Sequence, residues 1–243
     1  VDQWLEDNPS ALQPDALRRV VSLSYVQGET PNGNPATVST ITYDGGETTI
    51  HYLYPAPDVG DVTLDLMDEW PMDVWETVID TASFRDLTEQ PWSRSGPGLL
   101  LDFERRDGGW IDFDGDNVLQ ARPSAEPMRI VIQVPKSEGP YSVMTWDHGT
   151  GGHAYNAVQR ISTQDDSAAV IQTFADAGTV VVSRDQPLYG DRYSLIEDGF
   201  GGSLGFYNIG NLPAFRDNQR QGGADHRVLH RFVRDSLPDI LDI

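Results

Sequence analysis

The segment Thr179-Val-Val-Val-Ser183 decides the fold, because it is typical of a strand buried on both faces of a parallel sheet. It follows Ala168–Ala177, whose apolar residues recur at helical spacing, and Gly178, a residue type that commonly ends a helix. Two further apolar runs, Met128–Val134 and Tyr141–Trp146, precede this helix. The order of strands and helix predicts an α/β domain with a doubly wound sheet.

A second helix and a separate N-terminal region complete the predicted organisation. Asp225–Leu237 has the 3.6-residue period of an amphipathic helix. Residues 1–125 instead contain β-rich runs at glycine turns. Val38–Tyr43 and Thr48–Tyr54 flank Asp44-Gly45-Gly46, which predicts a hairpin. Leu99–Phe103 and Trp110–Phe113 predict another. We therefore expect a β-rich region over 1–125 and an α/β region over 126–243.

The composition excludes several function classes. The chain has 243 residues, no cysteine and a net charge of −21, so phosphates of nucleic acids would be repelled. Without cysteine there are no disulfides, thiolate metal sites or cysteine nucleophiles. No apolar run approaches the roughly 20 residues that span a bilayer. The acidic balance favours a secreted or salt-tolerant protein, and we expect a secreted, extracellular or periplasmic location.

The strongest chemical signal is Trp146-Asp-His-Gly-Thr-Gly-Gly152, directly after a predicted strand. Glycines at a strand end allow backbone N–H groups to turn outward, as stabilisation of an oxyanion requires. Here the chain resembles the α/β-hydrolase family, whose oxyanion loop follows the third strand. Gly178–Gly190 resembles that family's fourth strand and the Asp-x-Pro-x-x-Gly turn after it. Phe206–Gln221 is similar to a segment of large secreted bacterial lipases and esterases.

This resemblance implies a fold and an activity. Residues 126–243 would form the first half of an α/β-hydrolase domain, and the chain would belong to a serine hydrolase acting on small-molecule or polymer esters, without a cofactor. The oxyanion hole would comprise Gly149, Thr150 and Gly151, with Thr150 the favoured donor. The nucleophile would lie outside the chain, because Asp239–Ile243 stands where the family's fifth strand would begin. The downstream half of the same protein, as a second chain, is the expected partner.

Ser203 is the alternative nucleophile. Gly201-Gly-Ser-Leu-Gly205 fits the Gly-x-Ser-x-Gly pattern, but no apolar strand precedes it. Its base would have to be a helix residue, His226 or His230. A chain that uses Ser203 would be a small complete hydrolase. A further alternative is a non-catalytic binding or structural subunit that keeps the fold.

The metal-binding signals are weaker. Asp112–Asn117 resembles the start of a calcium loop, but its glycine is misplaced and Pro123 stands where the closing Glu belongs, so a hairpin turn is favoured. His226 and His230 are four residues apart, as in zinc pairs, yet no Glu lies between them. His51 is an isolated strand histidine without an evident partner in the sequence. We therefore expect no metal site.

The predicted elements leave an apolar surface to cover. A sheet of three strands would leave six apolar side chains half exposed, at a cost of roughly 1.5–3 kcal/mol for each one fully exposed. They are Val180, Val181, Val182, Val228, Phe232 and Val233. The sequence thus predicts that the chain does not fold independently and needs a partner.

Overall fold

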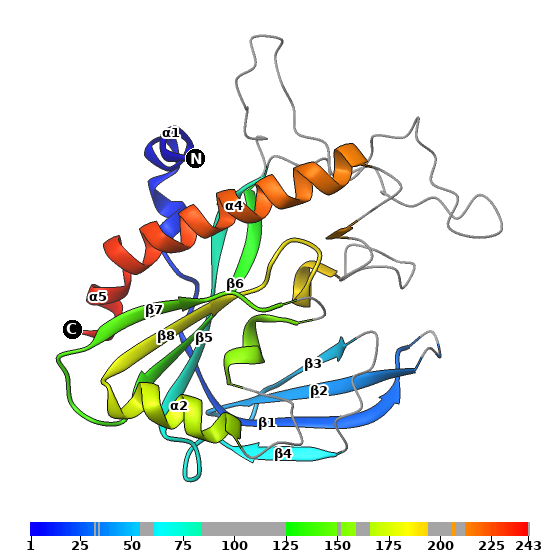
Figure 1. Cartoon of the computed structure of the whole chain (residues 1–243), viewed down its shortest axis with the longest axis vertical. Helices are drawn as coiled ribbons and strands as arrows, with labels where there is room; N and C mark the ends of the chain where they lie inside the picture. The colour runs from blue at the N-terminus through cyan, green and yellow to red at the C-terminus, as the bar shows by residue number, and fades with distance from the viewer. Residues whose placement is uncertain are drawn as a thin grey trace.

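A computed structural model gives the arrangement of the elements (Figure 1). It describes residues 1–31, 33, 35–53, 61–83, 125–149, 152–158, 166–193, 206–207 and 212–242. The strands are β1 (Arg18–Glu29), β2 (Pro35–Tyr43), β3 (Thr48–Leu53), β4 (Val62–Asp65), β5 (Met72–Ala82), β6 (Ala125–Pro135), β7 (Ser142–Trp146) and β8 (Thr179–Arg184). The α-helices are α1 (Asp2–Asp7), α2 (Asp166–Asp176), α4 (Leu212–Asp235) and α5 (Leu237–Leu241). The 3₁₀ helices are η1 (Pro9–Leu12), η2 (Ala154–Ala157) and η3 (Gly190–Tyr193).

All eight strands form one mixed sheet in the order β3-β2-β1-β5-β6-β8-β7, with β4 paired to β1. β5 and β6 pair antiparallel from Met72↔Pro135 to Ala82↔Ala125, so strands on both sides of residue 125 belong to the same sheet. β6 is also antiparallel to β8. Among the strands that the structure describes, β7 and β8 are the one parallel pair.

Helices cover both faces of the central strands (Figure 1). On one face, Val228, Leu229 and Phe232 of α4 pack on alternate residues of β6 and β8, with α1 and η1 completing the cluster. On the other face, α2 packs against Val181 of β8. Next to α2, Tyr155 of η2 packs against side chains of β1, β2 and β5. The alternation of side chains along each strand sends neighbouring residues into separate cores.

Several sequence predictions are confirmed. The first hairpin forms at Gly45 and Gly46, whose φ angles of +107° and +88° favour glycine at this turn. α2 is followed by Gly178 with a φ of +61°, as a C-terminal glycine should be. The predicted C-terminal helix exists but is longer, since α4 begins at Leu212. The second predicted hairpin, Leu99–Phe103 with Trp110–Phe113, lies outside the described residues.

The structure corrects two predictions. A β-rich mixed α/β fold is present, but the sheet is mostly antiparallel, and the β-α-β pattern of a doubly wound sheet occurs in its described part only at β7-α2-β8. The expected exposure of apolar side chains is wrong for five of the six. Val180, Val181, Val182, Val228 and Phe232 are fully buried, and Val233 is partly buried. The reason is that β5 joins β6 and enlarges the sheet, which α4 covers on one face and α2 covers on the other, where Val181 lies. In the described part of the chain, no helix has the length and apolarity needed to cross a membrane.

Candidate functional site

The glycine loop leaves the C-terminal end of β7 beside the end of β8. Because the two strands are parallel, the segments after Trp146 and Arg184 leave the sheet at the same end, where the carboxyl ends of both strands lie. In this loop Asp147 and Gly149 are exposed, while His148 is buried. Thr150 and Gly151, the other two predicted oxyanion residues, lie outside the described residues. The structure thus places one predicted donor, Gly149, at an exposed strand end.

His148 anchors the loop to the segment after β8. The backbone N–H of Gln186 donates to its Nε2 at 3.2 Å, and Nε2 of Gln186 donates to the His148 carbonyl at 2.6 Å. The remaining ring nitrogen, Nδ1, lies 2.8 Å from the Gly149 carbonyl. These partners fix a neutral tautomer with the proton on Nδ1, and burial lowers the pKa of His148. With both nitrogens engaged, His148 positions the loop and does not act as a base.

Two glycines of the loop differ in the space around them. A Cβ on Gly152 would lie 2.5 Å from Oδ1 of Asn156 and 2.7 Å from Cβ of His148, so no larger residue fits. No atom of the described residues lies within 4 Å of the corresponding position on Gly149. None of the described hydrogen bonds uses the Gly149 N–H as a donor. The loop is therefore tightly packed at one end and open at Gly149, where a ligand atom can approach.

Asp185, which follows β8, holds the residues after the glycine loop in place. Its carboxylate is fully buried and accepts a hydrogen bond from the Ala154 N–H at 2.7 Å, at the start of η2. Gly190 lies against that carboxylate, because a Cβ there would be 2.1 Å from Cγ of Asp185. The φ of Gly190 is +56°, which also favours glycine. The turn Asp185–Gly190, noted in the sequence, is thus a support for the glycine loop.

A buried network of charges connects α4 to the strand ends. Arg192 donates to Glu126 through Nε at 2.7 Å and to Asp225 through Nη1 at 2.6 Å. Burial disfavours the charged form of Arg192, but the two carboxylates outweigh it and raise its pKa. Arg184 lies 3.7 Å from Asp225 and donates toward Oδ1 of Asp147 at 3.1 Å. The network therefore ends at the first residue of the glycine loop.

His226 of α4 reaches the other oxygen of that carboxylate. Its Nδ1 is 3.0 Å from Oδ2 of Asp147, and its ring centroid is 4.3 Å from that of His230. Burial lowers the pKa of His226, with the carboxylate of Asp147 opposing it. Nδ1 is close to the carboxylate, but the geometry does not make a hydrogen bond. A small rotation of the ring that made one would give the arrangement of a general base, an imidazole held by a carboxylate through Nδ1. The sequence reasoning missed this pair, because no local pattern links a loop residue to a helix residue so distant in the chain.

The other candidate residues are placed as follows. Ser203 and the calcium-like segment Asp112–Asn117 lie outside the described residues. His51 on β3 is mostly buried near the charges of Arg129 and Asp185, and burial lowers its pKa to about 4. His230 lies beside His226, but the described residues contain no group of three or more acidic or histidine side chains suited to a metal ion.

Comparisons with known proteins add no relative. No family model matches the chain, and neither the search of curated proteins nor the search of solved structures finds a match.

Proposed function

We propose that this chain is part of a serine hydrolase that cleaves ester bonds, and that it supplies the oxyanion loop. The observation that carries the proposal is the exposed Gly149 at the end of β7, next to a loop end that His148 and Gly152 hold rigidly. A donor aimed at the developing negative charge of a tetrahedral intermediate contributes a factor of about 10² to 10³ in rate. Gly149, Thr150 and Gly151 are the proposed donors.

The topology supports the same assignment. β7, the glycine loop, α2 and β8 make a parallel β-α-β unit, in which an α/β-hydrolase places its oxyanion loop between strand and helix. The order β5-β6-β8-β7, with β6 antiparallel to both neighbours, is also that of the first four strands of an α/β-hydrolase sheet. We propose that 126–243 forms the first half of such a domain.

In this proposal a second polypeptide, most simply the downstream half of the same protein, supplies the serine, its histidine and the acid. The serine attacks the ester carbonyl, the histidine takes the serine proton, and the oxyanion is held by the loop of this chain. No cofactor takes part. A secreted or periplasmic setting would suit the net charge of −21.

A second candidate function is favoured by the pair of Asp147 and His226. Their 3.0 Å contact places an acid and a base beside the glycine loop, and Arg184 fixes the other carboxylate oxygen. If Ser203 approaches Nε2 of His226, this chain is a complete small hydrolase with its own triad. The acid would then precede the serine and the histidine in the sequence, an order that differs from the α/β-hydrolase order of serine, acid and histidine.

A fluorophosphonate probe, which labels activated serines, distinguishes these functions. Labelling of a polypeptide that purifies with this chain is the expected result. Labelling of this chain at Ser203, located by peptide mass spectrometry, would replace the proposal with the second candidate. If neither polypeptide is labelled, both hydrolase functions are contradicted, and a non-catalytic binding subunit is the function that is left.

A further inference from the structure

Two buried histidines hold the two ends of the glycine loop in the same way. Before the loop, Nε2 of His148 accepts the backbone N–H of Gln186 at 3.2 Å. After it, Nδ1 of His153 accepts the backbone N–H of Tyr155 at 3.3 Å. A backbone N–H only donates, so each accepting nitrogen must be without a proton. Both imidazoles are therefore neutral while these bonds exist.

A second proton on either ring is incompatible with these bonds. On His148 it would occupy Nε2 and turn the acceptor of the Gln186 N–H into a donor. The neutral ring of His153 carries its proton on Nε2, which is buried and has no hydrogen-bond partner in the described part of the chain. Protonated His153 would thus hold two buried donors without an acceptor, one of them against the Tyr155 N–H.

Charged and titratable groups from several elements face the two imidazoles. Besides the two histidines themselves, they are His51 of β3, Arg129 of β6, Asp147 after β7, Arg184 and Asp185 at the end of β8, and Tyr189 after it. The Asp185 carboxylate favours the charged form of both rings, but it already accepts the Ala154 N–H and lies 4.0 Å from Arg129. Burial outweighs it and lowers the pKa of both histidines, that of His153 to about 3.

The contacts on either side of the loop do not need a neutral imidazole. The hydroxyl of Tyr155 donates to Glu76, and its ring packs in the core against β1, β2 and β5. At the other side, Asp147 pairs with Arg184, and a protonated His226 would attract the same carboxylate. Protonation of His148 and His153 therefore acts on the two ends of the loop and leaves the segments outside them held.

We propose that His148 and His153 make the glycine loop acid-sensitive: each holds its end of the loop only while neutral, and protonation frees that end while the sheet stays folded. The consequence for catalysis rests on the proposed function. A freed loop no longer aims its N–H groups at a reacting carbonyl, so hydrolysis would be favoured at neutral pH over acid pH.

The test measures amide hydrogen exchange of the full chain by NMR at pH 7.5 and pH 5.5, relative to an unstructured chain at each pH. The amides of Gln186 and Tyr155 report the two bonds directly. A histidine that is neutral when held and has a pKa near 6.5 when released shifts the balance toward release about tenfold over this interval. We therefore expect the protection of each amide to fall by about tenfold.

Urea at low concentration separates local release from unfolding of the whole chain. Exchange at Gln186 and Tyr155 should not respond to it, because freeing a loop end exposes little surface. Exchange at Ile132, which is fully buried in β6 between β5 and β8, should accelerate. If all three amides respond alike, the chain opens only as a whole and the proposal is overturned.

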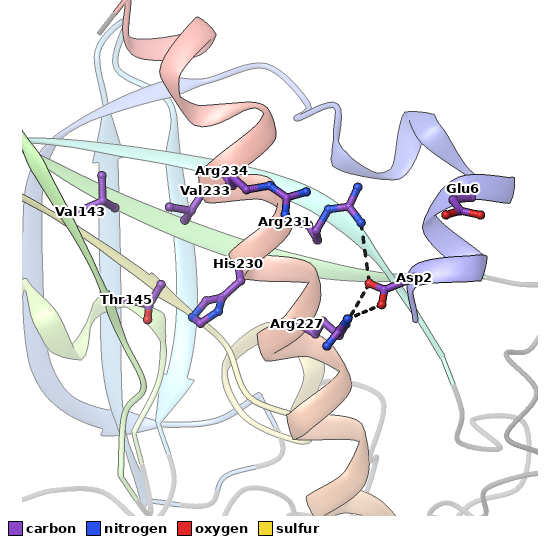
Figure 2. A pocket seen from close by; sticks show the side chains of 9 residues that line it. All are labelled: Asp2, Glu6, Val143, Thr145, Arg227, His230, Arg231, Val233 and Arg234. Atoms are coloured by element: carbon purple, nitrogen blue, oxygen red, sulfur yellow. Dashed lines mark hydrogen bonds and ion pairs between the residues drawn. The ribbon is translucent and has the colours of Figure 1, made fainter.

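Two substitutions keep an acceptor that does not titrate. Asparagine places an oxygen near the position of Nδ1, and glutamine places one near that of Nε2. His153→Asn should remove the pH dependence at Tyr155, and His148→Gln should remove it at Gln186. His230→Gln is the matched control and should keep both. Figure 2 shows His230 directed from α4 toward Thr145, and its exposed ring makes no hydrogen bond to the described part of the glycine loop.

The parent chain alone decides the proposal if a variant does not fold. Equal protection of both amides at the two pH values would overturn it. A fall in protection without any phosphonate labelling would support the acid-sensitive loop while contradicting the hydrolase proposal. Labelling with unchanged protection would contradict only the acid-sensitive loop.

Discussion

Nδ1 of His226 lies 3.0 Å from Oδ2 of Asp147, and Arg184 lies 3.1 Å from the other oxygen of the same carboxylate. Asp147 follows β7 directly, so α4 and β8 both hold the start of the glycine loop. The contact gives His226 either of two roles. It is a loop anchor if the reacting serine lies on a partner, and a general base if Ser203 reacts.

Substitution of His226 distinguishes these roles. In the proposed hydrolase, His226→Gln should leave kcat for ester hydrolysis within about threefold, because the base lies elsewhere. If Ser203 is the nucleophile, the same change removes the general base and should lower kcat by about 10⁶. Ser203→Ala is the companion variant and should remain active. Steady-state kinetics on the purified assembly measure both.

Gly151→Val tests the oxyanion assignment. We expect kcat to fall by about 10² to 10³ with a smaller change in KM, because the donor's interaction strengthens in the transition state. Circular dichroism establishes that the variant folds. A folded variant with an unchanged kcat would contradict the role of this loop.

Gly152 and Gly223 form a contrasting pair. Gly152→Ala places a methyl group 2.5 Å from Oδ1 of Asn156 and should lower the free energy of unfolding by about 1–3 kcal/mol. Gly223→Ala, on an open face of α4, should raise it by about 0.5–1 kcal/mol. Urea unfolding monitored by fluorescence gives both values. If both variants had the same effect, the described packing of the loop would be wrong.

Arg192→Met tests the buried charge network. It removes the cation that bridges the buried carboxylates of Glu126 and Asp225 and leaves Asp225 with Arg184 at 3.7 Å, so the free energy of unfolding should fall by about 3–5 kcal/mol. Arg234→Ala is the matched control. Its arginine is exposed and pairs with its neighbour Asp235, so the urea midpoint should not move. If Arg192→Met lowered the free energy of unfolding only slightly, water would have to reach the two carboxylates.

His153 makes stability depend on pH. Burial lowers its pKa to about 3, whereas an unfolded histidine has a pKa near 6.5. Below pH 6.5 the unfolded chain therefore binds the extra proton, and stability is lost as the pH falls toward the folded pKa. At pH 5 this group should account for about 2 kcal/mol of the loss.

His153→Asn is the variant to compare. Asparagine keeps a side-chain acceptor for the Tyr155 N–H at the start of η2 but does not titrate. The difference in unfolding free energy between pH 7.5 and pH 5 should be smaller in this variant. An unchanged difference would show that His153 does not remain neutral in the folded chain.

The sequence by itself determined the elements whose pattern is local. Alternation around Gly45 and Gly46 determined the first hairpin, and helical spacing that stops at Gly178 determined α2. The apolar run Thr179–Ser183 determined a buried strand. These features follow from the repeat of a strand or a helix and from the φ angles open to glycine, which involve only neighbouring residues.

Only the tertiary structure decided how these elements combine. The pairing of β5 with β6 turns an expected three-stranded remnant into an eight-stranded sheet and buries Val180, Val228 and Phe232. The tertiary structure also brings Asp147 close to His226, and Asp225 close to the buried Arg192. Such contacts join residues far apart in the chain. Which of these contacts form depends on which apolar faces pack together and on which charged groups are buried together. No local repeat in the sequence carries that information.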